Sequence, residues 1–70
     1  MYLVKERTHM LKMFVYDKKF GQPLIKYSVV DTETNEVLEQ GKRKEYDQIG
    51  EIYFSLIKKY GQENVKMLSH

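Results

Sequence analysis

The sequence predicts a small α+β domain, in which an antiparallel sheet of three to four strands (order β-β-β-α-β) packs one amphipathic helix on one face. Three observations predict this fold. Residues 10–16 alternate like a strand, residues 25–40 hold two strand patterns around a polar turn, and residues 45–60 repeat apolar side chains at helical spacing. The 70 residues suit a single domain spanning 1–70.

The first strand, residues 10–16, is apolar on both faces. Successive side chains of a strand point to opposite faces, so one face receives Leu11, Met13 and Val15. The other face receives Met10, Phe14 and Tyr16. One helix can cover only one of these faces. Residues 1–8 are therefore expected to be either a flexible tail or an extra strand that covers part of the second face.

A hairpin is predicted next. Gly21 and Pro23 separate the first strand from a second strand, Ile25–Val30, and a third strand follows at Val37–Gln40. The connecting residues 31–36 are rich in Asp, Thr and Asn, which favour chain reversal. Asn35 is the expected left-handed residue of this turn.

The helix is predicted over residues 45–60 and ends at Gly61, which can take a positive φ. Its apolar stripe consists of Ile49, Ile52, Tyr53, Leu56, Ile57 and Tyr60. Lys58 and Lys59 lie where cations favour the helix dipole. Residues 64–68 are too few for another helix, so we expect them to return to the sheet as a last strand.

Composition places the chain among cytoplasmic proteins that neither span a membrane nor carry disulfides. It has no cysteine, and it has no apolar run near the roughly 20 residues that cross a bilayer. The net charge is +2, with an excess of positive charge in residues 1–30 and of negative charge in residues 31–56. This balance alone does not indicate nucleic acid.

The sequence does not predict an enzyme, a cofactor or a metal site. His9 and His70 are the only histidines, and neither lies in a recognisable catalytic pattern. Residues 31–35 resemble the start of a calcium loop because oxygen ligands alternate there. However, Glu36 replaces the glycine and Lys42 the bidentate glutamate that such a loop needs, so we interpret the segment as a turn.

The second sheet face suggests a non-enzymatic interaction module. A contiguous exposed apolar patch usually marks a binding surface, here for a protein partner or for a second copy in a homodimer. The residues expected on that surface are Met10, Phe14, Tyr16, Leu24, Val30 and Leu38.

The alternative function is sheet-based nucleic-acid binding. Lysines interleaved with aromatic residues can contact phosphates and stack on bases, and Lys12 and Lys26 should share a face with Phe14 and Tyr16. The basic residues expected to take part are Lys12, Lys18, Lys19, Lys26, Lys42, Arg43 and Lys44.

Overall fold

The structure is a computed structural model that describes residues 10–69. Its elements are β1 (Leu11–Tyr16), β2 (Ile25–Asp31), β3 (Glu36–Arg43), α1 (Tyr46–Tyr60), a short 3-10 helix η1 (Gln62–Asn64) and β4 (Val65–Ser69). The predicted β-β-β-α-β order and α+β class are confirmed. His9, His70 and the tail or strand expected at residues 1–8 lie outside the described residues.

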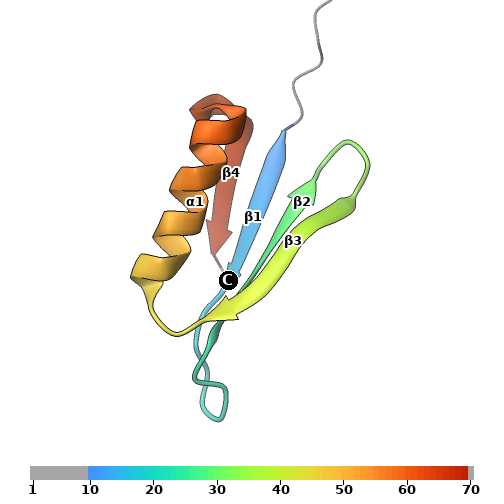
Figure 1. Ribbon diagram of the computed structural model, residues 1–70. Coiled ribbons are helices and arrows are strands. Elements are labelled where there is room, and N and C mark those ends of the chain that lie inside the picture. Colours follow the sequence, from blue (N-terminus) through green and yellow to red (C-terminus); the bar gives the residue numbers. More distant parts are fainter. Residues whose placement is uncertain (1–9, 70) are drawn as a thin grey trace, which may run out of the picture.

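The four strands form one sheet in the order β3-β2-β1-β4. β1, β2 and β3 are an antiparallel meander, whereas β4 joins the free edge of β1 in the parallel direction. The expected sheet was antiparallel throughout, so the parallel pair is a difference. It arises because α1 carries the chain across the sheet from the β3 edge to the β4 edge, as a parallel connection requires (Figure 1).

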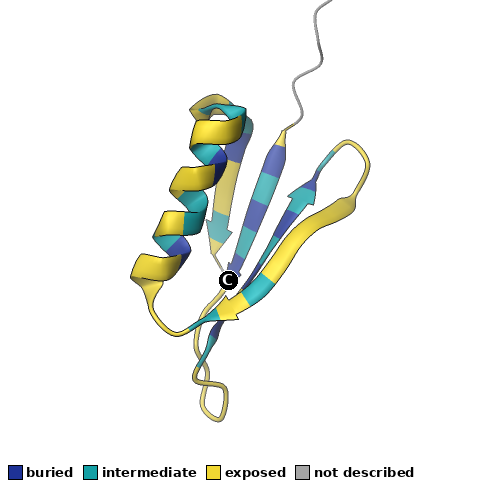
Figure 2. Cartoon of the chain, in the orientation of Figure 1, coloured by how far each residue is buried: buried dark blue, intermediate teal, exposed yellow. Residues whose placement is uncertain are grey.

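The core lies between α1 and one face of the sheet. Leu11, Met13 and Val15 of β1 are buried there, and Figure 2 shows the alternation of buried and half-buried residues along this strand. The rest of the buried apolar cluster comprises Ile25, Tyr27, Val29, Ile49, Leu56 and Val65. Partly buried residues of the predicted helix stripe pack against this cluster: Ile52, Tyr53, Ile57 and Tyr60.

Both ends of α1 are closed by side-chain hydrogen bonds. At the start, the Gln48 side-chain oxygen accepts bonds from the backbone N–H groups of Lys44 and Glu45, each at 3.1 Å. At the end, the Asn64 side-chain amide donates to the Tyr60 carbonyl oxygen at 2.8 Å. Gly61 follows the helix with a φ of 97°, so the positive φ expected there is present.

Two tight reversals link the antiparallel strands. Between β2 and β3, Asn35 has a φ of 62°, as predicted, and its N–H donates to the Asp31 carbonyl oxygen at 2.7 Å. Between β1 and β2, Lys19 and Gln22 exchange backbone hydrogen bonds of 3.0 and 2.8 Å around Phe20 and Gly21. Residues 17–24 thus form an arm, here called the hairpin arm, that extends past the end of the sheet (Figure 1).

β3 departs from its prediction in two ways. It continues beyond Gln40 to Arg43, so part of the expected junction with the helix belongs to the sheet. Its register also shifts opposite Val29 and Val30, where Glu39 pairs with Val29 and Val37 with Val30. Leu38 is the extra residue of this bulge, which interrupts the strict alternation that the sequence argument assumed.

Candidate nucleic-acid interface

One face of the sheet is left uncovered by α1 (Figure 2). Cross-strand partners share a face, so the register identifies the side chains that this open face carries. The open face consists of Lys12, Phe14, Tyr16, Lys26, Ser28, Val30, Val37, Gln40, Lys42, Lys66 and Leu68.

All charged residues at these paired positions are lysines. Lys12 lies directly opposite Lys66, and Lys26 lies directly opposite Lys42. Like charges opposite each other destabilise a sheet, so these pairs cost the free protein some stability. The carboxylates of the four strands belong to the other face, where the register places Asp31, Glu36 and Glu39.

Aromatic and polar groups lie between the lysines. Phe14 is half-buried, and its cross-strand neighbours are Ser28 and Leu68. Tyr16 is 39% exposed and pairs with Lys26. The row of Phe14 and the row of Tyr16 lie about 7 Å apart along the strands. The open face therefore offers ring surfaces within reach of cationic side chains.

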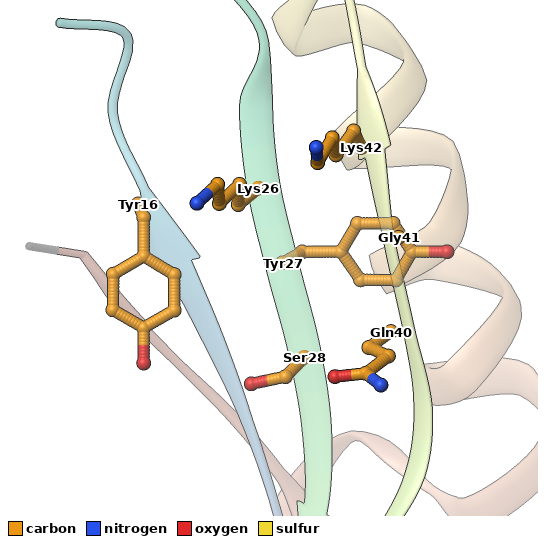
Figure 3. A pocket seen from close by; sticks show the side chains of 7 residues that line it. All are labelled: Tyr16, Lys26, Tyr27, Ser28, Gln40, Gly41 and Lys42. Carbon is orange, nitrogen blue, oxygen red and sulfur yellow. The ribbon is translucent and has the colours of Figure 1, made fainter. Parts of the chain in front are cut away.

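The open face is hollowed beside Tyr16. A depression of about 410 Å³ is lined by Tyr16, Lys26, Tyr27, Ser28, Gln40, Gly41 and Lys42. Figure 3 shows Lys26 and Ser28 on β2, between the Tyr16 ring of β1 and the Gln40 and Lys42 side chains of β3. A second depression of about 240 Å³ adjoins it, and Tyr16 and Lys26 line both. An aromatic ring, a hydroxyl, an amide and two ammonium groups thus surround one open volume.

The hairpin arm extends the surface beside Tyr16. Asp17, Lys19, Gln22 and Leu24 line the second depression together with Tyr16 and Lys26, so this depression carries one carboxylate beside two lysines. Phe20 lies at the tip of the arm with its full surface exposed, at a relative exposure of 106%. The sequence analysis did not single out Phe20. The sequence could have predicted its exposure, because Phe20 precedes a glycine between two predicted strands. A turn at that place leaves the side chain outside any core.

The structure brings together only some of the expected basic residues. Lys12, Lys26 and Lys42 share the open face, and Lys19 lies beside it. The remaining three do not occupy paired positions of the open face. The Lys18 ammonium lies 6.0 Å from the ring centre of Tyr46, the Arg43 guanidinium lies 5.4 Å from that of Tyr27, and Lys44 lies between β3 and α1.

Lys66 joins the open face although the sequence analysis did not include it. It does so because β4 pairs with β1 in a register that sets Lys66 opposite Lys12. Strand order and register are tertiary properties, and the alternation within residues 64–68 could not have placed this lysine next to Lys12.

The apolar residues expected on the second sheet face also do not all lie on it. Phe14, Tyr16 and Val30 lie on the open face, Leu24 lines its second depression, and Met10 is 38% exposed directly before β1. The placement of Leu38 on this face was wrong. The β3 bulge puts it in a groove on the helix side, lined also by Val29, Glu39, Ile52, Ser55, Leu56, Lys59 and Tyr60.

Among the ionisable groups of residues 10–69, Tyr27 has a pKa that clearly departs from its ordinary value. Tyr27 lies on the sheet face that α1 covers. Its hydroxyl donates a 3.0 Å hydrogen bond to Glu39 Oε2. Burial, and then the bond to and charge of Glu39, raise the pKa of Tyr27, while the nearby Arg43 opposes them. This arrangement stabilises a neutral phenol within the fold rather than preparing it to react.

No three His, Cys, Asp or Glu side chains of residues 10–69 gather in a way that could hold a metal ion. Within the same residues, no helix is both long and apolar enough to cross a membrane.

Comparison with protein families, with characterised proteins and with solved structures finds no significant match to this chain. Residues 10–69 form a small α+β domain in which α1 covers one sheet face and the other face is basic and aromatic.

Proposed function

We propose that this protein binds nucleic acid through the open face, without catalysis, in the cytoplasm. The supporting observation is the sorting of charge by face: the paired positions of the open face carry Lys12, Lys26, Lys42 and Lys66 and no carboxylate. Lysine contacts with phosphates provide most of the affinity of nonspecific nucleic-acid binding. A polyanion would also relieve the repulsion within the two lysine pairs.

The sorting of charge by face matters more than the net charge. The formal net charge of +2 is too small to indicate a polyanion partner, because seven carboxylates lie in residues 31–56. Glu36 and Glu39, the β3 members of this group, lie on the helix face. The open face consequently presents a positive surface despite the modest total.

Binding to a fluorescently labelled oligonucleotide, followed by anisotropy, tests the proposal. We expect Lys26→Gln with Lys42→Gln to weaken binding about tenfold or more, because two phosphate contacts are lost. Lys58→Gln with Lys59→Gln is the matched control, since it removes the same charge from the exposed end of α1 and should change the affinity little. Equal losses from both pairs would contradict a role for the open face.

Lys42→Glu separates binding from folding. The new carboxylate would lie opposite Lys26 and replace a repulsive pair with an attractive one, raising the free energy of unfolding by about 0.2–1 kcal/mol. The same change should weaken oligonucleotide binding. Urea unfolding and anisotropy would be measured on one preparation. Lower stability together with lower affinity would indicate instead that Lys42 supports the fold.

A protein partner or a second copy is the other candidate for this face. The observation in its favour is that Phe14, Tyr16, Leu24 and Val30 lie on or beside the open face, as the sequence analysis expected. Apposing two open faces would bring the lysines of both copies together, which is why we place this candidate second. Phe14→Asp should abolish a dimer detected by light scattering while the helical circular-dichroism signal persists. Equal association of the variant would exclude this candidate.

A further inference from the structure

We infer that the bound nucleic acid is single-stranded, and that its bases stack on Tyr16 and Phe20 at the hairpin end of the open face. The inference rests on the proposed function and names its ligand more closely. It draws on the exposure of two aromatic rings, the two depressions that Tyr16 lines and the lysines around them.

Phe20 is the first of these observations. Its side chain is fully exposed at the tip of the hairpin arm, so it contributes nothing to the core. Exposing a phenylalanine forgoes a burial free energy of roughly 1.5–3 kcal/mol. The backbone that carries the ring forms a tight turn, because Lys19 and Gln22 exchange hydrogen bonds across it and Gly21 takes a φ of 83°. An exposed ring next to Lys19 is suited to stacking on a base.

The position of Tyr16 is the second observation behind the inference. Tyr16 lines both depressions on this part of the face, and Lys26 lines both with it. In the larger depression, Ser28 and Gln40 supply a hydroxyl and an amide that can hydrogen-bond to a base edge, while Lys26 and Lys42 can reach a phosphate (Figure 3). The smaller depression leads from Tyr16 onto the hairpin arm, where it is lined by Asp17, Lys19, Gln22 and Leu24.

The order of these groups predicts the path of the strand. From the sheet outwards the chain presents the larger depression, the Tyr16 ring, the smaller depression and then the arm that bears Phe20. Bases of a single strand have free faces that can stack on successive rings, whereas a duplex keeps its base faces within its own stack. Aromatic rings exposed among lysines therefore favour a single strand.

The first test compares two exposed phenylalanines. Phe20→Ala should weaken binding to a labelled 12-nucleotide thymidine oligomer by about fivefold or more, since one base stack is lost. The thermal unfolding midpoint should not change, because Phe20 makes no core contact. Phe54→Ala is the matched control, because Phe54 is 63% exposed on α1, and it should leave the affinity unchanged. Equal affinities of the Phe20→Ala and original proteins would overturn the role of Phe20.

The second test concerns Tyr16. Tyr16→Phe keeps the ring and should retain affinity, whereas Tyr16→Leu keeps apolar bulk without a ring and should lose about fivefold or more. An oligomer of the same length without bases should bind both proteins equally weakly. Equal affinity of Tyr16→Leu and Tyr16→Phe for the thymidine oligomer would overturn stacking at Tyr16.

The outcomes separate this inference from the proposed function. One outcome would overturn the inference and leave the proposed function standing. In it, the protein binds a duplex and a single strand equally well, and the double variant Lys26→Gln with Lys42→Gln loses this binding. The variants Phe20→Ala and Tyr16→Leu retain it. No binding of either nucleic acid at low salt would remove both. A third outcome is that the protein binds anionic phosphatidylserine vesicles but no oligomer, and that Phe20→Ala weakens the vesicle binding. This result would show that the hairpin arm contacts a lipid surface, and it would overturn the inference.

Discussion

Gly41 lies where the ring of Tyr27 crosses from β2 onto β3. The two residues are cross-strand partners, and a Cβ added at Gly41 would lie 3.1 Å from both Cε1 and Oη of Tyr27. Tyr27 is 3% exposed and its hydroxyl is bonded to Glu39, so the ring has little room to move. Glycine at this position lets a bulky phenol fit close to an edge strand.

Gly41→Ala should therefore lower the free energy of unfolding by about 1 kcal/mol, measured in urea at neutral pH. The expected loss combines overpacking against Tyr27 with the smaller gain from replacing a strand glycine. An unchanged or higher stability would show that the Tyr27 ring yields and that its position is not fixed.

Tyr27 also predicts a pH dependence. Its pKa is raised above the ordinary value of 10.0, chiefly by burial and then by Glu39. A raised acid pKa means that the neutral form is favoured in the folded state. The stability associated with it is fully present below pH 10 and declines as the pH rises through the folded pKa.

The measurement compares the original protein with Tyr27→Phe, which has no phenol to ionise. We expect the stability advantage of the original protein to be smaller at pH 11 than at pH 8. Glu39→Gln should lower the pKa of Tyr27 toward its ordinary value, because it removes the carboxylate charge beside the phenol. A constant difference between the original protein and Tyr27→Phe across this range would contradict the assignment.

Residues whose role depends on local backbone geometry were predictable from sequence. Asn35 and Gly61 both have the positive φ expected of them, because turns and helix ends impose their own chemistry on nearby residues. Leu38 was misplaced, because a bulge depends on how β3 meets β2 rather than on its own pattern.

At the scale of elements, α1 combines a clear apolar stripe with one weak position. Gly50 lies in its interior, and a Cβ there would meet nothing within 4 Å. Helical glycine costs roughly 0.5–1 kcal/mol relative to alanine, and Gly50 has no close neighbour that requires it.

Gly50→Ala should consequently raise the free energy of unfolding by about 0.5–1 kcal/mol. The same glycine-to-alanine change is thus expected to act in opposite directions at positions 41 and 50. A loss of stability at position 50 would show that a backbone or partner approaches the helix there, and chemical denaturation of both variants under one set of conditions would decide.

The elements themselves were largely evident in the sequence, but their arrangement was not. The helix stripe and the alternation of β1 come directly from side-chain periodicity, and α1 begins and ends within one residue of its expected bounds. The place of β4 beside β1, by contrast, depends on which edge the crossover reaches. Periodicity carries no information about that choice.

At the scale of the whole molecule, charge separates across the sheet rather than along the chain. The sequence suggested opposed segments, positive in residues 1–30 and negative in residues 31–56. In the fold, Lys42 from the negative segment joins Lys12 and Lys26 on the open face, and Lys66 completes the set from the C-terminal strand. The sequence thus predicted some residues of the candidate site, while the strand register was needed to show that they share one face.

The presence of these four lysines on one face predicts how the binding of nucleic acid depends on salt concentration. If Lys12, Lys26, Lys42 and Lys66 each contact a phosphate of a single strand, the logarithm of the association constant should fall with the logarithm of salt concentration at a slope of about −3. Affinity would then drop about fiftyfold between 50 and 200 mM salt.

Lys66→Gln is the most informative variant in this titration, because Lys66 belongs to the open face only through the pairing of β4 with β1. It should make the slope shallower by about 0.7, as should Lys26→Gln, since each removes one phosphate contact. Lys58→Gln should leave the slope unchanged, because Lys58 lies on α1. A slope altered by Lys26→Gln but not by Lys66→Gln would mean that the nucleic acid follows β1 to β3 without reaching β4. Equal changes would mean that it crosses the whole sheet.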